Sequence, residues 1–259
     1  MGRDKDRESP EGDLNYAGGR LRLFVEARLH AGAKVPPSEG QAHYLLHVMR
    51  AREGDRVLLF NGVDGEWRAR LAEVTRRNCT LVCEAQTEAQ SDVPDLWLAF
   101  APIKKTPADY VTQKATELGV RVLQPVITRR TVARRVNLNR LRANAIEAAE
   151  QSGRLTVPLL REPVGLDALL NSWPTERQLL FCDEGGDAAP IAEALTQASD
   201  RSQWGVLTGP EGGFDPEERA TIRQRAFVLP VTLGPRIVRA DTAALAALAV
   251  WQAICGDWS

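Results

Sequence analysis

The sequence predicts an α/β protein of two parts, a small β-rich N-terminal domain and a larger domain with a mainly parallel sheet. Before residue 90, short apolar runs are separated by the dipeptides Asn61-Gly62 and Asp64-Gly65, which are typical of β-hairpin turns. After Asp95, predicted strands and helices alternate, as in βαβ units. We therefore expect a β-rich domain over 20–90 and an α/β domain over 91–259.

The composition is that of an ordinary globular protein. The chain has 259 residues, of which 44% are hydrophobic and 26% charged, and its net charge is −1. Because the chain as a whole is not basic, any contact with nucleic acid has to come from a local patch. Residues 1–19 are polar and lack periodicity, so we predict a disordered tail there. No apolar run reaches the ~18 residues that a membrane span needs.

The cysteines and histidines indicate a reduced protein without a metal site. The four cysteines are Cys79, Cys83, Cys182 and Cys255. They are scattered and follow no secretory signal, so we expect a cytoplasmic location. His43 and His47 lie one helical turn apart, but no third ligand of a suitable type is apparent. We therefore predict no bound metal and interpret these histidines as lying on a helix surface or facing RNA.

Each domain has its own set of predicted elements. In the N-terminal domain we expect a helix over 40–49 and strands over 22–25, 57–60, 66–74 and 79–84. In the C-terminal domain we expect strands over 96–100, 120–126, 178–183, 204–208 and 227–233. Helices are expected after an N-cap at Thr106, over 137–151, from about 190, after a capping box at Asp215 and over 241–253. Gly119 is expected to end the first of these helices.

Two glycine-cornered turns follow successive predicted strands. The first is Gly209-Pro210-Glu211-Gly212-Gly213-Phe214, and the second is Leu233-Gly234-Pro235-Arg236-Ile237-Val238-Arg239. In parallel α/β sheets, ligands bind at the carboxyl ends of strands, so two such corners together predict a ligand site. Neither corner has a phosphate-binding motif of the P-loop or dinucleotide type. The pattern therefore favours a ligand that is held by backbone groups beside an adenine-sized apolar slot.

A strongly basic stretch precedes these turns. Residues 101–154 carry eleven basic and four acidic residues, although the net charge of the whole chain is −1. A stretch this one-sided is better explained by a phosphate-binding surface than by simple solvation, so we expect it to bind RNA. The residues predicted to bind RNA are Lys104, Lys105, Lys114, Arg129, Arg130, Arg134, Arg135, Arg140, Arg142 and Arg154.

Both turns, together with Ala240-Asp241-Thr242-Ala243, resemble the sequence motifs of the RsmE family, the 16S ribosomal RNA uridine-N3 methyltransferases of the SPOUT superfamily. Upstream, the segments 117–120 and 147–154 also resemble family blocks, and the segment 43–50 resembles the PUA-like N-terminal domain. The resemblance extends from residue 20 to the C-terminus. One departure is that the family has Thr-Glu where this chain has Ala240-Asp241.

The resemblance implies a trefoil knot in the C-terminal domain, a homodimer, and S-adenosylmethionine bound among the knotted loops. The apolar final helix suits burial in such a dimer. The resemblance implies 16S ribosomal RNA of the small ribosomal subunit as the partner, and no association with a membrane is expected. The cofactor-binding residues expected are Leu207, Thr208, Gly209, Pro210, Glu211, Gly212, Leu233, Gly234, Arg236, Ile237, Arg239, Thr242 and Ala243.

The chemistry of this reaction selects candidate catalytic residues. Uracil N3 is a weak acid that must lose its proton before it attacks the methyl group, so the enzyme has to align the atoms and stabilise the anion. Arginine suits that task, and we expect it of Arg22, Arg236 and Arg239. Glu211 or Asp241 is expected to act as a base or to orient an arginine. The alternative is that Arg239 and Asp241 only pair with each other.

Two other functions remain open from the sequence. One is a ribose 2′-O-methyltransferase of the same superfamily, which the PUA-like domain and the segment 43–50 disfavour. The other is a non-catalytic RNA-binding protein of ribosome assembly, which the intact glycine corners disfavour.

Overall fold

The structure is a computed structural model that describes residues 12–16, 19–102, 105–133, 135–185, 187–198 and 202–258. It divides the chain into two compact units. The N-terminal unit comprises the chain up to Asp92 together with Ala149–Thr156. The C-terminal unit comprises Val93–Ala148 and Val157–Ser259. The boundary expected after residue 90 lies close to the first of these points, whereas residues 149–156 were expected in the C-terminal domain and belong to the N-terminal unit.

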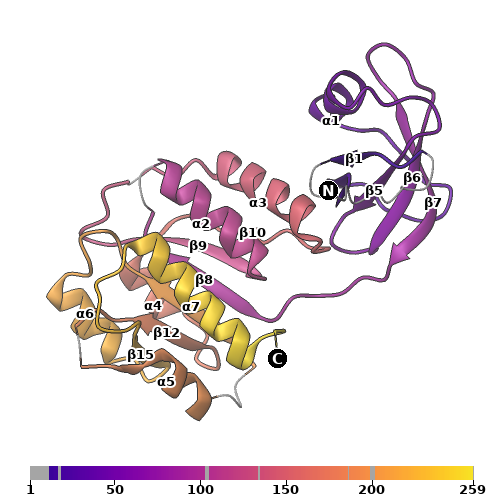
Figure 1. Cartoon of the computed structure of the whole chain (residues 1–259). Helices are drawn as coiled ribbons and strands as arrows, with labels where there is room; N and C mark the ends of the chain where they lie inside the picture. Colours follow the sequence, from indigo (N-terminus) through magenta and orange to yellow (C-terminus); the bar gives the residue numbers. More distant parts are fainter. Residues whose placement is uncertain are drawn as a thin grey trace, which may run out of the picture. The chain divides into compact units, whose positions relative to one another are not determined.

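The N-terminal unit is built on a five-stranded sheet (Figure 1). The strand order is β3-β5-β6-β7-β4, with β3 parallel to β5 and the other neighbours antiparallel. Apolar side chains on alternate positions of these strands form one buried cluster that includes Leu23, Leu59 and Leu81. The strands are β3 (Arg22–Phe24), β4 (Lys34–Val35), β5 (Arg56–Phe60), β6 (Glu66–Ala72) and β7 (Thr80–Glu88).

A single helix was expected over 40–49, and the structure divides it in two. The α-helix α1 (Glu39–His43) begins with a capping box in which Ser38 and Gln41 exchange hydrogen bonds. The chain then continues as a π-helix, η1 (Tyr44–Val48). The apolar periodicity predicts the helix, but it does not distinguish one turn type from the other.

The disordered tail expected over 1–19 is wrong for its last part. Asn15–Tyr16 (β1) pairs with Gly19–Arg20 (β2) in a short antiparallel ladder, and the Leu14 amide donates to the Arg56 carbonyl at 2.9 Å. These backbone hydrogen bonds form an ordered edge that polar composition alone does not reveal. Residues 1–11 lie outside the described part of the chain.

The C-terminal unit is built on a parallel sheet, which confirms the expected α/β fold. Its order is β10-β9-β8-β14-β12-β15-β13, and β11 also pairs with β9. Every pairing between these strands is parallel. The strands are β8 (Leu96–Phe100), β9 (Val122–Ile127), β10 (Leu159–Leu160), β11 (Val164–Gly165), β12 (Gln178–Cys182), β13 (Ala189–Pro190), β14 (Trp204–Thr208) and β15 (Val228–Thr232).

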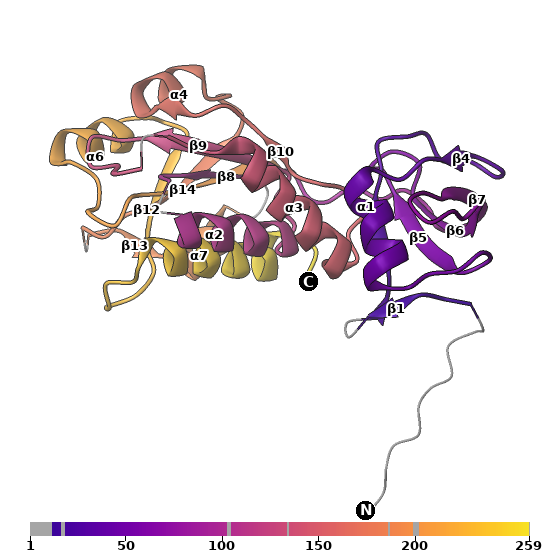
Figure 2. The same ribbon diagram turned by 90° about the horizontal axis from the view of Figure 1, so that it is seen from above.

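Helices cover both faces of this sheet. Figure 2 shows α2 and α7 side by side on one face and α4 on the other. Alternate strand residues feed the two cores, because successive side chains point to opposite faces. Phe100 packs with α2 and α7, for example, whereas Ala99 packs with α4. The helices are α2 (Lys105–Glu117), α3 (Leu138–Ser152), α4 (Leu166–Ser172), α5 (Ile191–Gln197), α6 (Pro216–Arg223) and α7 (Ala240–Cys255).

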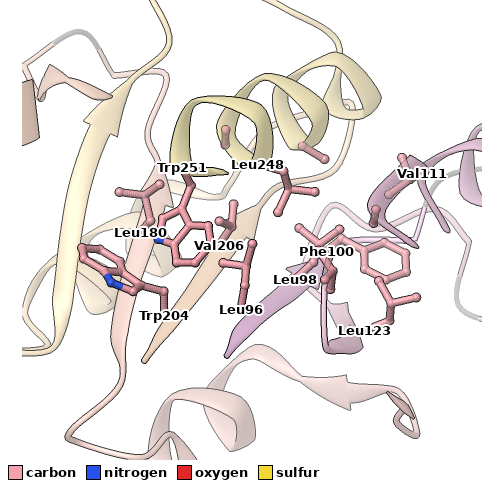
Figure 3. Packing of buried hydrophobic residues seen from close by; sticks show 14 of the residues in the cluster. Leu96, Leu98, Phe100, Val111, Leu123, Leu180, Trp204, Val206, Leu248 and Trp251 are labelled. Carbon is pink, nitrogen blue, oxygen red and sulfur yellow. The ribbon is translucent and has the colours of Figure 1, made fainter. Parts of the chain in front are cut away.

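The larger core centres on two fully buried tryptophans. Figure 3 shows Trp204 of β14 and Trp251 of α7 among leucine and valine side chains from β8, β12, β14 and α7. On the opposite face, Gly205 lies against the indole of Trp173, so that a Cβ at residue 205 would come within 2.5 Å of the ring. This tight packing fixes β14, the strand that leads into the first glycine corner.

The predicted ends of two helices, α2 and α6, can be compared with the structure. Gly119 follows α2 with φ +78, which confirms it as the end of this helix. The helix already includes Lys105, however, so the expected N-cap at Thr106 is wrong and Thr106 lies inside the first turn. The capping box at Asp215 and Glu218 is confirmed at the start of α6. None of the helices among the described residues is long and apolar enough to span a membrane.

Candidate functional site

Three neighbouring strands end at one edge of the C-terminal sheet. β12 lies between β14 and β15 and is parallel to both. Because parallel strands place their carboxyl ends on the same side, the loops that follow these strands lie next to one another. The two glycine corners are the loops after β14 and β15, so the structure brings them together across β12.

These loops enclose a cavity of about 570 Å³. That volume lies in the range of about 300–1,000 Å³ found for small-molecule sites. The wall is formed by three loops and the first turn of α7. The residues of the wall are Cys182, Asp183, Glu184, Gly209, Pro210, Glu211, Gly213, Phe214, Thr232, Leu233, Gly234, Pro235, Arg236, Ile237, Val238, Arg239, Ala240 and Ala243.

The loop after β14 is a tight turn that depends on its glycines. The Gly213 amide donates to the Pro210 carbonyl at 2.9 Å, and Gly213 has φ +66, a backbone conformation that side chains disfavour. A Cβ at residue 209 would come within 2.7 Å of the Phe214 ring, so Gly209 lets that ring close the turn. Phe214 in turn packs edge-on against Phe181 of β12 at 5.2 Å between ring centroids. The turn is thus fixed to the neighbouring strand.

The loop after β15 leads directly into α7. Gly234 has φ +109, and its amide donates to the Thr232 hydroxyl at 3.3 Å. Arg239 is the N-cap residue of α7, and its carbonyl accepts from the Ala243 amide at 2.8 Å. Between these points Pro235, Arg236 and Ile237 are exposed, Ile237 by 91%, and Val238 is partly buried. This wall therefore combines ordered backbone at both ends with free side chains in the middle.

The third wall, after β12, was not predicted from the sequence. Its central residue is Asp183, whose side chain is only 1% exposed. The Asp183 carboxylate accepts from Arg219 Nε at 2.7 Å, from an Arg223 guanidinium nitrogen at 2.8 Å and from the Gly185 amide at 3.1 Å. The hydrogen bond that Arg219 donates to Asp183 is the main cause that raises the pKa of Arg219. These bonds attach the loop to α6.

Charged side chains of both signs face the cavity. Glu184 and Glu211 are exposed acids in its wall, and Arg236 and Arg239 are exposed bases. Beside them, desolvation raises the pKa of the Cys182 thiol to about 12, so this thiol stays neutral. A zwitterionic small molecule would find a partner for each of its charges in this wall.

The structure brings together most of the residues expected to hold a cofactor, but not all of them. Nine of the thirteen line the cavity. Leu207 and Thr208 are instead buried within β14, and Gly212 and Thr242 are exposed outside the wall. Leu207 packs in the sheet core, and the Thr208 carbonyl accepts from the Ala101 amide at 3.1 Å. These four positions therefore lie outside the wall of the cavity, and their part in cofactor binding stays a prediction.

Arg22 has internal partners within the N-terminal unit. It is 8% exposed, and its Nε donates to Glu66 at 2.6 Å. Its other guanidinium nitrogens donate to the carbonyls of Ala149 at 2.8 Å and Arg154 at 3.1 Å. A guanidinium that satisfies a buried carboxylate and several carbonyls stabilises the unit. These contacts favour a structural role over the catalytic one expected for Arg22.

Asp241 lies outside the cavity wall. Its carboxylate accepts from the Thr242 amide at 2.7 Å at the start of α7. Among the ion pairs of the described residues, none joins Asp241 to Arg239, so the alternative in which these two side chains only pair with each other has no support. Glu211 lies in the wall and is the better placed acid of the two.

Two of the arginines expected to bind RNA contact the loop after β14. Arg130 donates to the Gly212 carbonyl at 2.9 Å. Arg129 donates to Asp215 at 2.8 Å and to Glu217 at 2.6 Å, and Glu217 is the main cause that raises the pKa of Arg129. The basic stretch is therefore partly neutralised by acids from α6, which lie far away in the sequence. We call Arg129 and Arg130 together the arginine latch.

The other basic residues of this stretch have varied surroundings. Arg140 pairs with Asp109, and Lys114 pairs with Glu117 at 2.8 Å. Arg135 and Arg142 are exposed, whereas Arg154 belongs to the N-terminal unit, where it donates to Thr156 at 3.0 Å. Lys104, Arg134 and the side chain of Lys105 lie outside the described residues. The expected RNA surface therefore carries less free positive charge than its composition indicates, and RNA binding by these residues stays a prediction.

Family models match both parts of the chain. Residues 89–252 match a family described as an RNA methyltransferase domain, and residues 38–83 match an RNA methyltransferase PUA domain. A protein of Rickettsia conorii named ribosomal RNA small subunit methyltransferase E is 31% identical over 229 residues, which cover 88% of this chain and 93% of that protein. A protein of Synechocystis with the same name is 31% identical over 236 residues, which cover 90% of this chain and 77% of that protein.

Solved structures give the same result. A ribosomal RNA small subunit methyltransferase E of Neisseria gonorrhoeae, bound to S-adenosyl methionine, superposes with a TM-score of 0.83 at 28% identity and covers 92% of this chain and 99% of that chain. A putative methyltransferase of Legionella pneumophila, in complex with the same cofactor, superposes with a TM-score of 0.83 at 29% identity and covers 92% of this chain and 98% of that chain.

Proposed function

Because this chain belongs to the ribosomal RNA small subunit methyltransferase E family, we propose that it methylates N3 of a uridine in 16S ribosomal RNA with S-adenosylmethionine as the methyl donor. The observation that carries this proposal is the cavity between the loops that follow β12, β14 and β15. The cavity lies at the carboxyl edge of a parallel sheet, and α/β folds with parallel sheets bind their ligands at this edge.

The wall of the cavity fits the methyl donor. Its volume of about 570 Å³ is sufficient for a nucleoside with an amino-acid tail. The glycine turns expose backbone amides and carbonyls that would hold an adenine by hydrogen bonds. Glu184 and Arg236 offer opposite charges for the amino and carboxyl groups of the tail. When bound, S-adenosylmethionine supplies a methyl group on a positively charged sulfur.

The side chains of the wall would serve the target base. The proton on uracil N3 has to leave as the N3–methyl bond forms and the methyl–sulfur bond breaks. Glu211 is placed to accept that proton, directly or through water. Arg236 and Arg239 would hold the negative charge that develops on the uracil, because arginine stays charged and offers several donors.

The test is a methylation assay followed by analysis of the product nucleosides. The full chain is incubated with S-adenosylmethionine and unmethylated 16S ribosomal RNA or small subunits, and the RNA is digested and examined by mass spectrometry. We expect N3-methyluridine. A 2′-O-methylated nucleoside in its place would contradict the assignment, and a protein that binds no S-adenosylmethionine in calorimetry would contradict the enzyme itself.

Variants of the wall test the individual roles. Arg239→Ala and Glu211→Gln should lower the turnover by 100-fold or more, on the order of what one positioned charge or base contributes. The matched control is Arg77→Ala, which removes an exposed arginine outside both the cavity and the predicted RNA-binding residues and should leave the turnover nearly unchanged. Full turnover in Arg239→Ala would remove this residue from the site.

We also propose that the enzyme works as a homodimer in the cytoplasm, where ribosomal subunits are assembled. Helix α7 packs on α2 and α5 through Ala244, Leu248 and Trp251, and small apolar side chains of its other face are only partly covered. The preceding loop exposes Ile237. Light scattering of the purified chain tests this proposal, and a mass of one chain at micromolar concentration would contradict it.

A further inference from the structure

The segment that follows α1 in the N-terminal unit has an irregular backbone. Residues 44–48 form a π-helix, in which the Met49 amide donates to the Tyr44 carbonyl at 2.9 Å. π-Helical turns are rare and are frequently found at functional sites. The proposed function leaves this segment without a role.

Arg50 ends the π-helix in a conformation that side chains disfavour. Its φ is +56, and the Ala51 amide then donates to the Leu45 carbonyl at 2.9 Å. This is the position after a helix at which glycine is the common residue. Four residues later, at Gly54, the chain does have a glycine where φ is positive. A strained residue that persists where glycine would fit indicates that its side chain is needed.

The side chain of Arg50 is exposed, and the part of the molecule that the structure describes provides no hydrogen bond or ion pair for it. The nearby acid Glu53 is occupied elsewhere. Its carboxylate accepts from the amides of Glu73 at 3.2 Å and Val74 at 2.9 Å. The guanidinium is therefore free to contact an external anion.

Two histidine rings lie on the exposed side of this region, one at the end of α1 and one in the π-helix. His43 and His47 are one turn apart, and their ring centroids are 4.9 Å apart with an angle of 39° between the planes. Both residues are exposed, and Val48 beside them is 58% exposed. Leu45, by contrast, is fully buried and anchors the segment in the core. The two tilted rings thus form an exposed aromatic surface that rests on a fixed support.

We propose that His43, His47, Val48 and Arg50 form a binding face for unpaired RNA, which we call the histidine face. A base would stack on the imidazole rings and Val48, and a phosphate next to it would contact the Arg50 guanidinium. Stacking on planar side chains together with a phosphate contact is the general way in which proteins hold single-stranded nucleic acid. This inference rests on the proposed function, because it assigns the histidine face to the RNA substrate.

Variants at Arg50 separate RNA binding from stability. The full chain is titrated with a fluorescein-labelled, uridine-rich RNA of twelve nucleotides, and the anisotropy is measured at several salt concentrations. Arg50→Gly relieves the positive φ, so we expect its melting temperature to equal or exceed that of the wild type. Its affinity for the RNA should fall about tenfold, and the slope of log affinity against log salt should become shallower by about 0.7, the value for one phosphate contact on a single strand.

Further variants control for charge and for stacking. Arg77→Ala removes an exposed arginine from the turn between β6 and β7 and should change the affinity less than twofold. His47→Ala should weaken binding, and His47→Phe should restore it, because a phenyl ring stacks without a charge. An affinity of Arg50→Gly equal to that of the wild type would overturn the proposal. So would a loss of affinity accompanied by a lower melting temperature, since that would be a structural effect.

The experiment also distinguishes this proposal from the proposed function. Arg50→Gly should bind S-adenosylmethionine in calorimetry as the wild type does, because the cavity lies in the C-terminal unit. If the wild type produced no N3-methyluridine but bound the RNA through Arg50, the methylation would be refuted and the histidine face would stand. If the wild type methylated the RNA and Arg50→Gly kept its full affinity, only the histidine face would be refuted.

Discussion

Replacing Asp183 by asparagine tests whether the buried carboxylate holds the third wall of the cavity. The asparagine keeps the shape of the side chain but removes the charge that faces Arg219 and Arg223. Removing one partner of a buried ion pair costs about 3–5 kcal/mol. The two arginine side chains are 32% and 28% exposed and keep Asp187 as a partner, so solvent offsets part of this loss. We therefore expect a loss of about 2 kcal/mol in the free energy of unfolding.

The measurement is calorimetric melting of the full chain with and without S-adenosylmethionine. A loss of about 2 kcal/mol corresponds to a melting temperature that is lower by roughly 4–8 °C for a protein of this size. Because Asp183 holds the loop that contains Cys182 and Glu184, the ligand should also stabilise the variant less than the wild type.

The chain offers a matched control at Asp187. This carboxylate pairs with the same two arginines, at 2.6 Å and 2.7 Å, but its side chain is 64% exposed. Solvent screening makes such pairs weak, so Asp187→Asn should lower the melting temperature much less than Asp183→Asn does. Equal effects of the two variants would refute the argument, because burial is the main difference between the two sites.

Three further predictions concern the arginine latch, the packing at Gly205 and the Cys182 thiol. Arg130→Ala removes the donor to the loop after β14 and should raise the dissociation constant of S-adenosylmethionine about two- to fivefold in calorimetry, whereas Arg135→Ala should not. Gly205→Ala places a methyl group within 2.5 Å of the Trp173 indole and should cost about 1–3 kcal/mol in urea unfolding; an unchanged midpoint would show that the ring can move. Burial raises the pKa of Cys182 from 9.0 to about 12, so its alkylation by iodoacetamide should stay slow at pH 9. As the pH rises, the thiol loses its proton in the unfolded chain before it does so in the folded chain. The stability that this group contributes should therefore be complete below pH 9 and decline between pH 9 and 12. Rapid alkylation of Cys182 at pH 8 would contradict the raised pKa.

Local features of the fold could be predicted from the sequence because they depend on nearby residues. The strand 204–208 has the predicted bounds, and the capping box from Asp215 to Glu218 is formed within four consecutive residues. The two glycine corners were found for the same reason, since each follows an apolar run directly. Their meeting in one cavity follows from a general property of parallel sheets rather than from any single residue.

Features that depend on the order of the strands could not be predicted. The loop at Cys182 and Asp183 joins the cavity because β12 lies between β14 and β15, and no local pattern gives that order. Likewise, a count of charges treats Arg129 as free, although its partner Asp215 lies 86 residues away. For Arg22, the partners lie 44 and 127 residues away, so the sequence did not reveal that this arginine is buried.

The course of α3 limits how this protein can be taken apart or recombined. The helix begins in the C-terminal unit, and its last residues, from Ala149, belong to the N-terminal unit. Three of the carbonyls that accept from Arg22 come from this later segment, those of Ala149, Glu150 and Arg154. A fragment cut at Asp92 would therefore leave a buried cation without most of its acceptors. The N-terminal unit is thus not a detachable module, and a chimera that exchanges it would have to carry residues 149–156 along from the middle of the other half.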